Sequence, residues 1–240
     1  MKIEIWSDFA CPFCYIGKRR LEAALSQFPH KDKVETMFRS FELDPHAKRD
    51  THLSLYEILA AKYGMPVEKA KGMTEQVAQQ AKEVGLDYHF DTVVSTNTLD
   101  AHRLAHYANA NGKMTEMVER LLKAFFTDSL HLGDHQVLAQ LAAEIGLDRE
   151  KTLAMLAGDE YTEQVQADKQ KGANLGINGV PFFVFNDKYA LSGAQPGEVF
   201  VNVLNKVWEE ENAAPTLQFV QTDEKEESSG DNCADGSCKL

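Results

Sequence analysis

The stretch SDFACPFCYIG, residues Ser7 to Gly17, carries two cysteines three positions apart, directly after a short apolar segment. Residues 2–6 alternate apolar and charged side chains, which predicts a strand, and Ser7 with Asp8 predicts the turn that ends it. From Cys11 to Phe28 apolar residues recur at three-to-four spacing, which predicts an amphipathic helix. The cysteine pair therefore stands at the N-terminal end of a predicted helix.

The position of the first cysteine favours reactivity. Cys11 at a helix N-terminus would face unpaired backbone N–H groups and the positive end of the helix dipole, which favour its thiolate. We expect Cys11 to be the exposed nucleophile and Cys14, one turn further, to attack the mixed disulfide that Cys11 forms. Pro12 suits the first helical position because no N–H donor is needed there, and Phe13 adds no charge. The pattern predicts a redox-active dithiol.

A cysteine pair with this spacing can also be half of a tetrahedral zinc site, which requires a second close pair. Cys233 and Cys238 could supply it, but they lie near the other end of the chain in an acidic segment. His131 and His135 are spaced like ligands on one helix face, yet Gly133 stands between them and no third ligand is apparent. We therefore predict no metal site and favour disulfide chemistry for the first pair.

The predicted elements after the first helix follow the order strand, helices, hairpin, helix. Residues 34–43 predict a second strand, which completes a βαβ unit. From residue 50 to about residue 170, amphipathic segments follow one another with no convincing strand. Residues 179–193 predict a hairpin with an Asn-Asp turn, and residues 194–210 predict a last helix. The breaks between the predicted helices fall at Gly64, Gly85, Gly112, Gly133, Gly146 and Gly158.

Charge and composition exclude several classes of partner. The 240 residues include 25 basic and 37 acidic side chains, a formal net charge of −12 that opposes binding to nucleic acid. No window reaches the roughly 18 uninterrupted apolar residues of a membrane span, and Glu4 and Asp8 interrupt any N-terminal signal segment. We expect a cytoplasmic protein with no membrane partner. Because ordinary thiols stay reduced in the cytosol, four cysteines there suggest chemistry or metal binding before structural disulfide bridges.

Four stretches carry a resemblance to a known family: SDFACPFCYIGKRRLE at residues 7–22, RSFELDP at 39–45, NTLDAHRLAHYA at 97–108 and GINGVPFFVFNDKYALSGAQP at 176–196. In order and spacing they resemble the DsbA-type branch of the thioredoxin superfamily. Within that branch the chain resembles the FrnE-like oxidoreductases most closely. The likeness extends over nearly the whole chain up to Trp208.

The resemblance implies an α/β protein, a thioredoxin fold interrupted by a large all-helical insertion domain. Residues 1–45 and 171–212 would form the two halves of the thioredoxin domain, residues 46–170 the insertion, and residues 213–240 an acidic flexible tail. It implies a cis peptide at Val180–Pro181 facing the cysteines, with Pro181 in the catalytic set. Val180, Pro12 and Phe13 would then contact the substrate, which could pair with the Val180 backbone like an added strand. His102 is expected to pack rather than to catalyse.

The second cysteine pair, Cys233 and Cys238, is separated by four small or polar residues that allow a disulfide without strain. Some FrnE-like proteins carry a similar C-terminal pair. One hypothesis makes it an auxiliary redox couple that exchanges electrons with Cys11 and Cys14, or a redox-sensitive clasp. The alternative is a dispensable end, or an appendage that binds metal weakly or is easily oxidised.

These observations predict a thiol-disulfide oxidoreductase or isomerase acting on protein or small-molecule disulfides through Cys11 and Cys14. It would hold no tightly bound cofactor and would exchange with glutathione or other thiol couples. Two other classes stay open. One is a chaperone-like module that binds polypeptides through its helices. The other is a glutathione-dependent isomerase of small molecules, although such relatives typically lack the complete cysteine pair.

Overall fold

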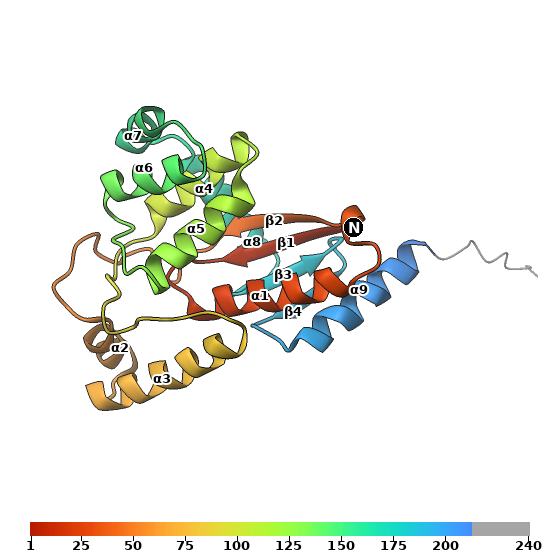
Figure 1. Cartoon of the computed structure of the whole chain (residues 1–240), viewed down its shortest axis with the longest axis horizontal. Coiled ribbons are helices and arrows are strands. Elements are labelled where there is room, and N and C mark those ends of the chain that lie inside the picture. The colour runs from red at the N-terminus through yellow and green to blue at the C-terminus, as the bar shows by residue number, and fades with distance from the viewer. Residues whose placement is uncertain (213–240) are drawn as a thin grey trace, which may run out of the picture.

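A four-stranded mixed sheet joins the two ends of the described chain. The computed structural model describes residues 1–212, and the strands lie in the order β2–β1–β3–β4 (Figure 1). The first strand pairs in parallel with the second and antiparallel with the third, which forms a hairpin with the fourth. Their bounds are β1 (Lys2–Ser7), β2 (Glu35–Ser40), β3 (Phe182–Phe185) and β4 (Tyr189–Ser192). The predicted βαβ and ββα units thus build one sheet.

The hairpin turn follows from two residues that tolerate the left-handed conformation. Asn186 and Asp187 have φ values of 49° and 53° and, together with Lys188, connect β3 to β4. Two left-handed residues give a turn whose twist matches that of the paired strands. The predicted hairpin is confirmed.

Helices cover both faces of the sheet. α1 (Pro12–Gln27) and α9 (Gly197–Glu211) pack against each other on one face, while α8 (Thr162–Asn174) packs on β2 (Figure 1). Side chains alternate along β1, because successive residues of a strand point to opposite faces. Ile3 and Ile5 belong to the large hydrophobic core, whereas the indole N–H of Trp6 donates to a backbone oxygen of α8.

The position of α8 could not be read from its periodicity. The sequence pattern assigns residues up to 170 to the helical insertion, and most of this helix precedes that point. Its contacts are with β2 and α4 together, and Gly172 lies so close to Trp6 that a Cβ atom would stand 2.8 Å from the indole nitrogen. This helix therefore covers the sheet, although its sequence continues the amphipathic pattern of the insertion.

The remaining helices lie between the two parts of the sheet in the sequence. Glycines with φ between 62° and 87° follow four predicted helices, which confirms those breaks. Residues 84–98 differ from the all-helical expectation: they form an irregular segment with turns, and the His89 N–H in it donates to the carbonyl of Phe126 at 2.8 Å. The helices are α2 (Leu55–Tyr63), α3 (Val67–Glu83), α4 (Leu99–Ala110), α5 (Met114–Phe126), α6 (His135–Glu144) and α7 (Arg149–Ala157).

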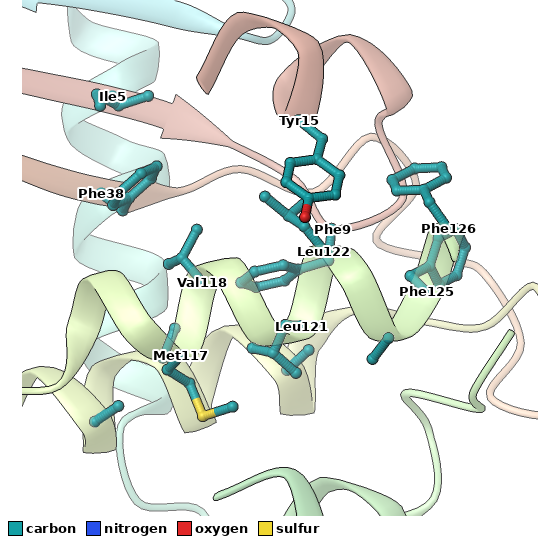
Figure 2. Packing of buried hydrophobic residues seen from close by; sticks show 14 of the residues in the cluster. Ile5, Phe9, Tyr15, Phe38, Met117, Val118, Leu121, Leu122, Phe125 and Phe126 are labelled. Atoms are coloured by element: carbon teal, nitrogen blue, oxygen red, sulfur yellow. The ribbon is translucent and has the colours of Figure 1, made fainter. Parts of the chain in front are cut away.

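One hydrophobic core runs from the sheet into these helices. Figure 2 shows Val118 on the side of α5 that faces Phe38 of β2, and Met117 on the other side of the same helix. Tyr15 of α1 joins the same cluster. The apolar face of α5 thus bridges the sheet and the neighbouring helices. No helix within residues 1–212 is long and apolar enough to cross a membrane.

Candidate active site

The cysteine pair stands at the start of α1. Cys11 is the N-cap residue, with φ −96° and ψ 110°, and Pro12 occupies the first helical position. The backbone N–H of Cys14 donates to the carbonyl of Cys11 at 3.0 Å, which places the second thiol one turn into the helix. Both cysteines are free thiols. The sequence predicted this arrangement because proline at the first helical position and the apolar spacing are local signals.

The burial of Cys11 differs from the expected exposed nucleophile. Its side chain is only 4% exposed, close to the 3% of Cys14. The Cys11 thiol donates to the carbonyl of Val180 at 3.5 Å. Tyr88 reaches the same helix end, where its hydroxyl donates to the Pro12 carbonyl at 2.7 Å. Residues from distant segments therefore cover the sulfur, which local sequence cannot reveal.

Cys14 is held in its protonated form. Burial and then the neighbouring Cys11 thiol raise the pKa of Cys14 well above its usual range, while the Ser7 hydroxyl and the Asp8 amide act in the opposite direction. The Asp8 N–H donates to the Cys14 sulfur at 3.5 Å. An inner thiol that is protonated at rest suits a residue that acts second, after the first sulfur has reacted.

The Val180–Pro181 peptide bond is cis, as the resemblance implied, and it lies beside α1. A Cβ atom placed on Gly17 would stand 3.1 Å from Pro181, so the helix and the proline are in close contact. The Pro181 carbonyl accepts from the Gly193 N–H at 2.8 Å, which ties the loop to the end of the hairpin. The fold thus brings Pro181 and the carbonyl of Val180 next to the cysteine-bearing helix.

Two large apolar side chains at this end of the molecule are exposed. Phe13 is 38% exposed and Leu43 is 40% exposed. Leu43 belongs to this end of the molecule, because its N–H donates to the Asp8 carboxylate at 2.7 Å. An exposed aromatic ring and an aliphatic side chain next to a dithiol suit a substrate that brings apolar groups with its sulfur.

A buried acid–histidine pair lies directly behind Cys14. His102 Nε2 stands 3.3 Å from Asp8 Oδ1, and both side chains are almost fully buried. Burial alone would raise the pKa of Asp8, but His102 and the Leu43 N–H outweigh it and lower that pKa. Sequence reasoning assigned His102 to packing and Asp8 to the turn after the first strand, and did not pair the two residues. The available signal was an acidic residue inside the apolar turn that precedes the cysteines.

The two histidines considered as metal ligands, His131 and His135, bond other groups. His131 Nε2 bonds the carbonyl of Arg49 at 2.8 Å, and His135 Nε2 pairs with Asp100 at 2.7 Å. Residues 1–212 contain no cluster of three or more His, Cys, Asp or Glu side chains that could hold a metal ion. Cys233 and Cys238 lie outside the described residues.

The sheet with its flanking helices, and a free dithiol at the start of α1, define a thioredoxin-fold protein of the DsbA type. The sequence model of the DSBA-like thioredoxin domain family matches residues 2–205, and the chain belongs to this family. This match confirms both the predicted fold class and the resemblance to the DsbA branch. The closer likeness to FrnE-like proteins stays a prediction.

Individual relatives agree with this assignment. The chain is 30% identical over 208 residues to YwbO of Bacillus subtilis, an uncharacterized protein, covering 85% of this chain and 95% of YwbO. The sequence is 40% identical to that of a probable DsbA oxidoreductase from Streptomyces coelicolor. The crystal structure of that protein matches this one with a TM-score of 0.84, covering 92% of this chain and 94% of that one. The cytosolic disulfide reductase DsbM of Pseudomonas aeruginosa, solved with glutathione, shares the fold at 15% identity, with a TM-score of 0.62 over 87% and 100% of the two chains.

Proposed function

We propose that this protein is a thiol-disulfide oxidoreductase in which Cys11 attacks a disulfide and Cys14 resolves the product. The observation that carries the proposal is the assembly at the end of α1. Cys11 caps the helix, Cys14 follows one turn later, and the carbonyl of Val180 lies 3.5 Å from the Cys11 sulfur. This arrangement holds a nucleophile, a resolving thiol and the Val180 backbone at one place.

The exchange balances as two successive substitutions at sulfur. The Cys11 thiolate attacks one sulfur of the substrate disulfide, and the other substrate sulfur leaves as a thiolate. Cys14 then attacks the Cys11 sulfur, so the Cys11–Cys14 disulfide forms and the second substrate thiolate leaves. Two electrons pass from the protein to the substrate. The oxidised protein can run the same steps in reverse, and its potential relative to the surroundings sets the direction.

The substrate is a protein or small-molecule disulfide that approaches along Val180 and Pro181. An extended segment can hydrogen-bond to free backbone beside a strand, as an added strand does. Phe13, which is 38% exposed, offers an apolar contact beside Cys11. Glutathione or another thiol couple would restore the starting redox state. The likeness in fold to a disulfide reductase solved with glutathione supports that choice. The cytosolic location stays a prediction.

Reduction of insulin tests the proposal. With a small thiol as electron source, the protein should accelerate the precipitation of insulin chains, and Cys11→Ser should remove the acceleration. A glutathione-dependent isomerase would tolerate the loss of Cys14. A chaperone-like module would suppress aggregation even as the Cys11→Ser variant. Equal acceleration by the wild type and Cys11→Ser would contradict the proposal.

A further inference from the structure

In the proposed exchange, the proton of the Cys14 thiol has no stated acceptor. The inference about this proton rests on the proposed function. Cys14 carries a proton at rest, since burial and the Cys11 thiol raise its pKa. Only a thiolate attacks a disulfide efficiently, so the proton has to leave when Cys14 resolves the mixed disulfide. At 3% exposure the sulfur has little access to bulk water. An acceptor inside the protein would therefore speed the second step.

The nearest carboxylate is a poor acceptor. Asp8 touches Cys14 through its backbone N–H, but its carboxylate already receives donors on both oxygens. Oδ1 accepts from the Ala10 N–H at 3.4 Å and faces His102, and Oδ2 accepts from the Leu43 N–H at 2.7 Å. These donors favour the ionised form and lower the pKa of Asp8. The carboxylate is thus suited to orient a partner.

That partner is the ring of His102 on α4. Because Asp8 Oδ1 can only accept, the facing Nε2 of His102 carries the hydrogen, which leaves Nδ1 of a neutral ring as a proton acceptor. Nδ1 has no hydrogen-bond partner among the described residues. Phe9 lies against the ring with centroids 4.7 Å apart and fixes its plane. Asp8 therefore orients the imidazole through Nε2, and Nδ1 can accept a proton.

A small cavity lies between this ring and Ser7, and neither cysteine lines it. Ser7 and His102 both line it, and its volume of about 10 Å³ has room for roughly one water molecule. The Ser7 hydroxyl also interacts with the Cys14 sulfur, whose thiolate it favours. A hydroxyl can accept one hydrogen bond while it donates another, so it can pass a proton along such a chain.

We propose that His102, oriented by Asp8, accepts the proton that Cys14 releases, and that Ser7 with one water in the cavity carries it. As Cys14 attacks the Cys11 sulfur, the S–H proton moves to Ser7, Ser7 passes its own proton through the water to His102 Nδ1, and the substrate thiolate leaves. The imidazole becomes an imidazolium beside the Asp8 carboxylate. In the reverse direction His102 returns the proton to the Cys14 thiolate.

Few charged groups lie near this proton path. His106, one turn further along α4, lines the same cavity, but its Nε2 contacts Asp168 and Ser40, each at 3.1 Å. Arg39 borders the cavity from β2 and is paired with Glu4 and Asp168. α5 contributes the apolar Met114 and Val118. The titratable groups facing Cys14 are Cys11, Tyr88 and Asp8.

The test separates the two thiol steps in one trace. The full chain with Cys233→Ser and Cys238→Ser is reduced and mixed with the aromatic disulfide dithiobis(nitrobenzoate), and released thiolate is followed by stopped-flow absorbance. Attack by Cys11 gives the first phase, and resolution by Cys14 gives the second. We expect His102→Gln to slow the second phase about a hundredfold at neutral pH, the size of a general-base contribution, with the first phase unchanged. The deficit should shrink as the pH rises, because hydroxide replaces the missing acceptor.

Three further variants keep the inference testable. Ser7→Ala removes only a hydroxyl and should reproduce the same pH-dependent deficit if His102→Gln does not fold. His135→Gln breaks an unrelated histidine–carboxylate pair with Asp100 and should leave both phases unchanged. A deficit equal at every pH, or one found in His106→Gln instead, would overturn the inference. Absence of a second phase in the parent protein would instead refute the proposed function.

Discussion

The Cys11 thiol donates a hydrogen bond to the carbonyl of Val180 at 3.5 Å across 169 positions of sequence. The two residues come from opposite halves of the thioredoxin fold, Cys11 from the start of α1 and Val180 from the segment before β3. Pairing of β1 with β3 holds the two halves in place, so the contact depends on the whole sheet. This contact places the Val180 backbone, which we propose binds the substrate, next to Cys11, the proposed nucleophile.

Loss of the resolving thiol should trap the substrate. In Cys14→Ser the mixed disulfide between Cys11 and a substrate has no internal thiol to resolve it, so it should accumulate. Non-reducing electrophoresis and intact-mass measurement would detect the adduct. The matched control is Cys11→Ser, which should form no adduct on the first pair. Equal trapping by the two variants would show that Cys11 is not the nucleophile.

The contact between Tyr88 and the active-site helix should contribute to stability. The buried Tyr88 hydroxyl donates to the Pro12 carbonyl at 2.7 Å, and its ring stacks on Phe126 with centroids 4.7 Å apart. Tyr88→Phe keeps the ring and removes one buried hydrogen bond, so the free energy of unfolding should fall by about 1 kcal/mol in urea titration. Tyr56→Phe, which loses an exposed bond to Asp91, is the control and should change less. Equal losses would contradict this reasoning.

Two helical glycines should respond in opposite directions to alanine. A Cβ atom at Gly172 of α8 would lie 2.8 Å from the Trp6 ring, whereas one at Gly72 of α3 would meet nothing within 4 Å. Gly172→Ala should lower the free energy of unfolding by about 1–3 kcal/mol through overpacking. Gly72→Ala should raise it by about 0.5–1 kcal/mol through helix propensity. Thermal unfolding of both variants would measure these two changes. Stabilisation by Gly172→Ala would show that α8 is not packed tightly against Trp6.

The buried carboxylate of Glu4 should give a pH-dependent contribution to stability. Burial would raise the pKa of Glu4, but hydrogen bonds and charges of Lys171 and Arg39 lower it to about 2. A depressed pKa contributes stability above the unfolded value near 4.5, and the contribution is lost as the pH falls toward 2. Glu4→Gln should cost about 2 kcal/mol at pH 7, less than the full shift implies because water screens the partly exposed partners.

Urea titrations of the wild type and Glu4→Gln at several pH values would measure this dependence. The difference between the two proteins should be constant above about pH 5 and should shrink below it. A difference that stays constant down to pH 3 would mean that the cost comes from packing and not from the carboxylate charge.

The tail cysteines lie outside the described residues, and their role stays a hypothesis. If Cys233 and Cys238 pass electrons to or from the first pair, replacing both by serine should slow turnover with a disulfide substrate. Turnover and the redox equilibrium of Cys11 with Cys14 should be measured on the same two proteins. Unchanged values would remove the auxiliary role and leave the first pair as a complete site.

Local sequence alone predicted the elements that position the dithiol. Pro12 after Cys11 marks a helix start, and Asn186 with Asp187 marks a hairpin turn. Such signals depend on residues within a few positions of one another, so the strands, the active-site helix and the hairpin could be assigned before any contact was known. The resemblance then supplied the expected sheet and the position of Pro181.

Tertiary structure decided which groups surround the sulfurs. His102 meets Asp8 across 94 positions, Tyr88 bonds Pro12 across 76, and α8 continues a helical pattern yet covers the sheet. Periodicity reports which face of an element is buried but not which distant face it meets. The burial of Cys11 and the environment of Cys14 therefore arise only when the chain closes, because burial and hydrogen bonding are properties of the assembled contacts.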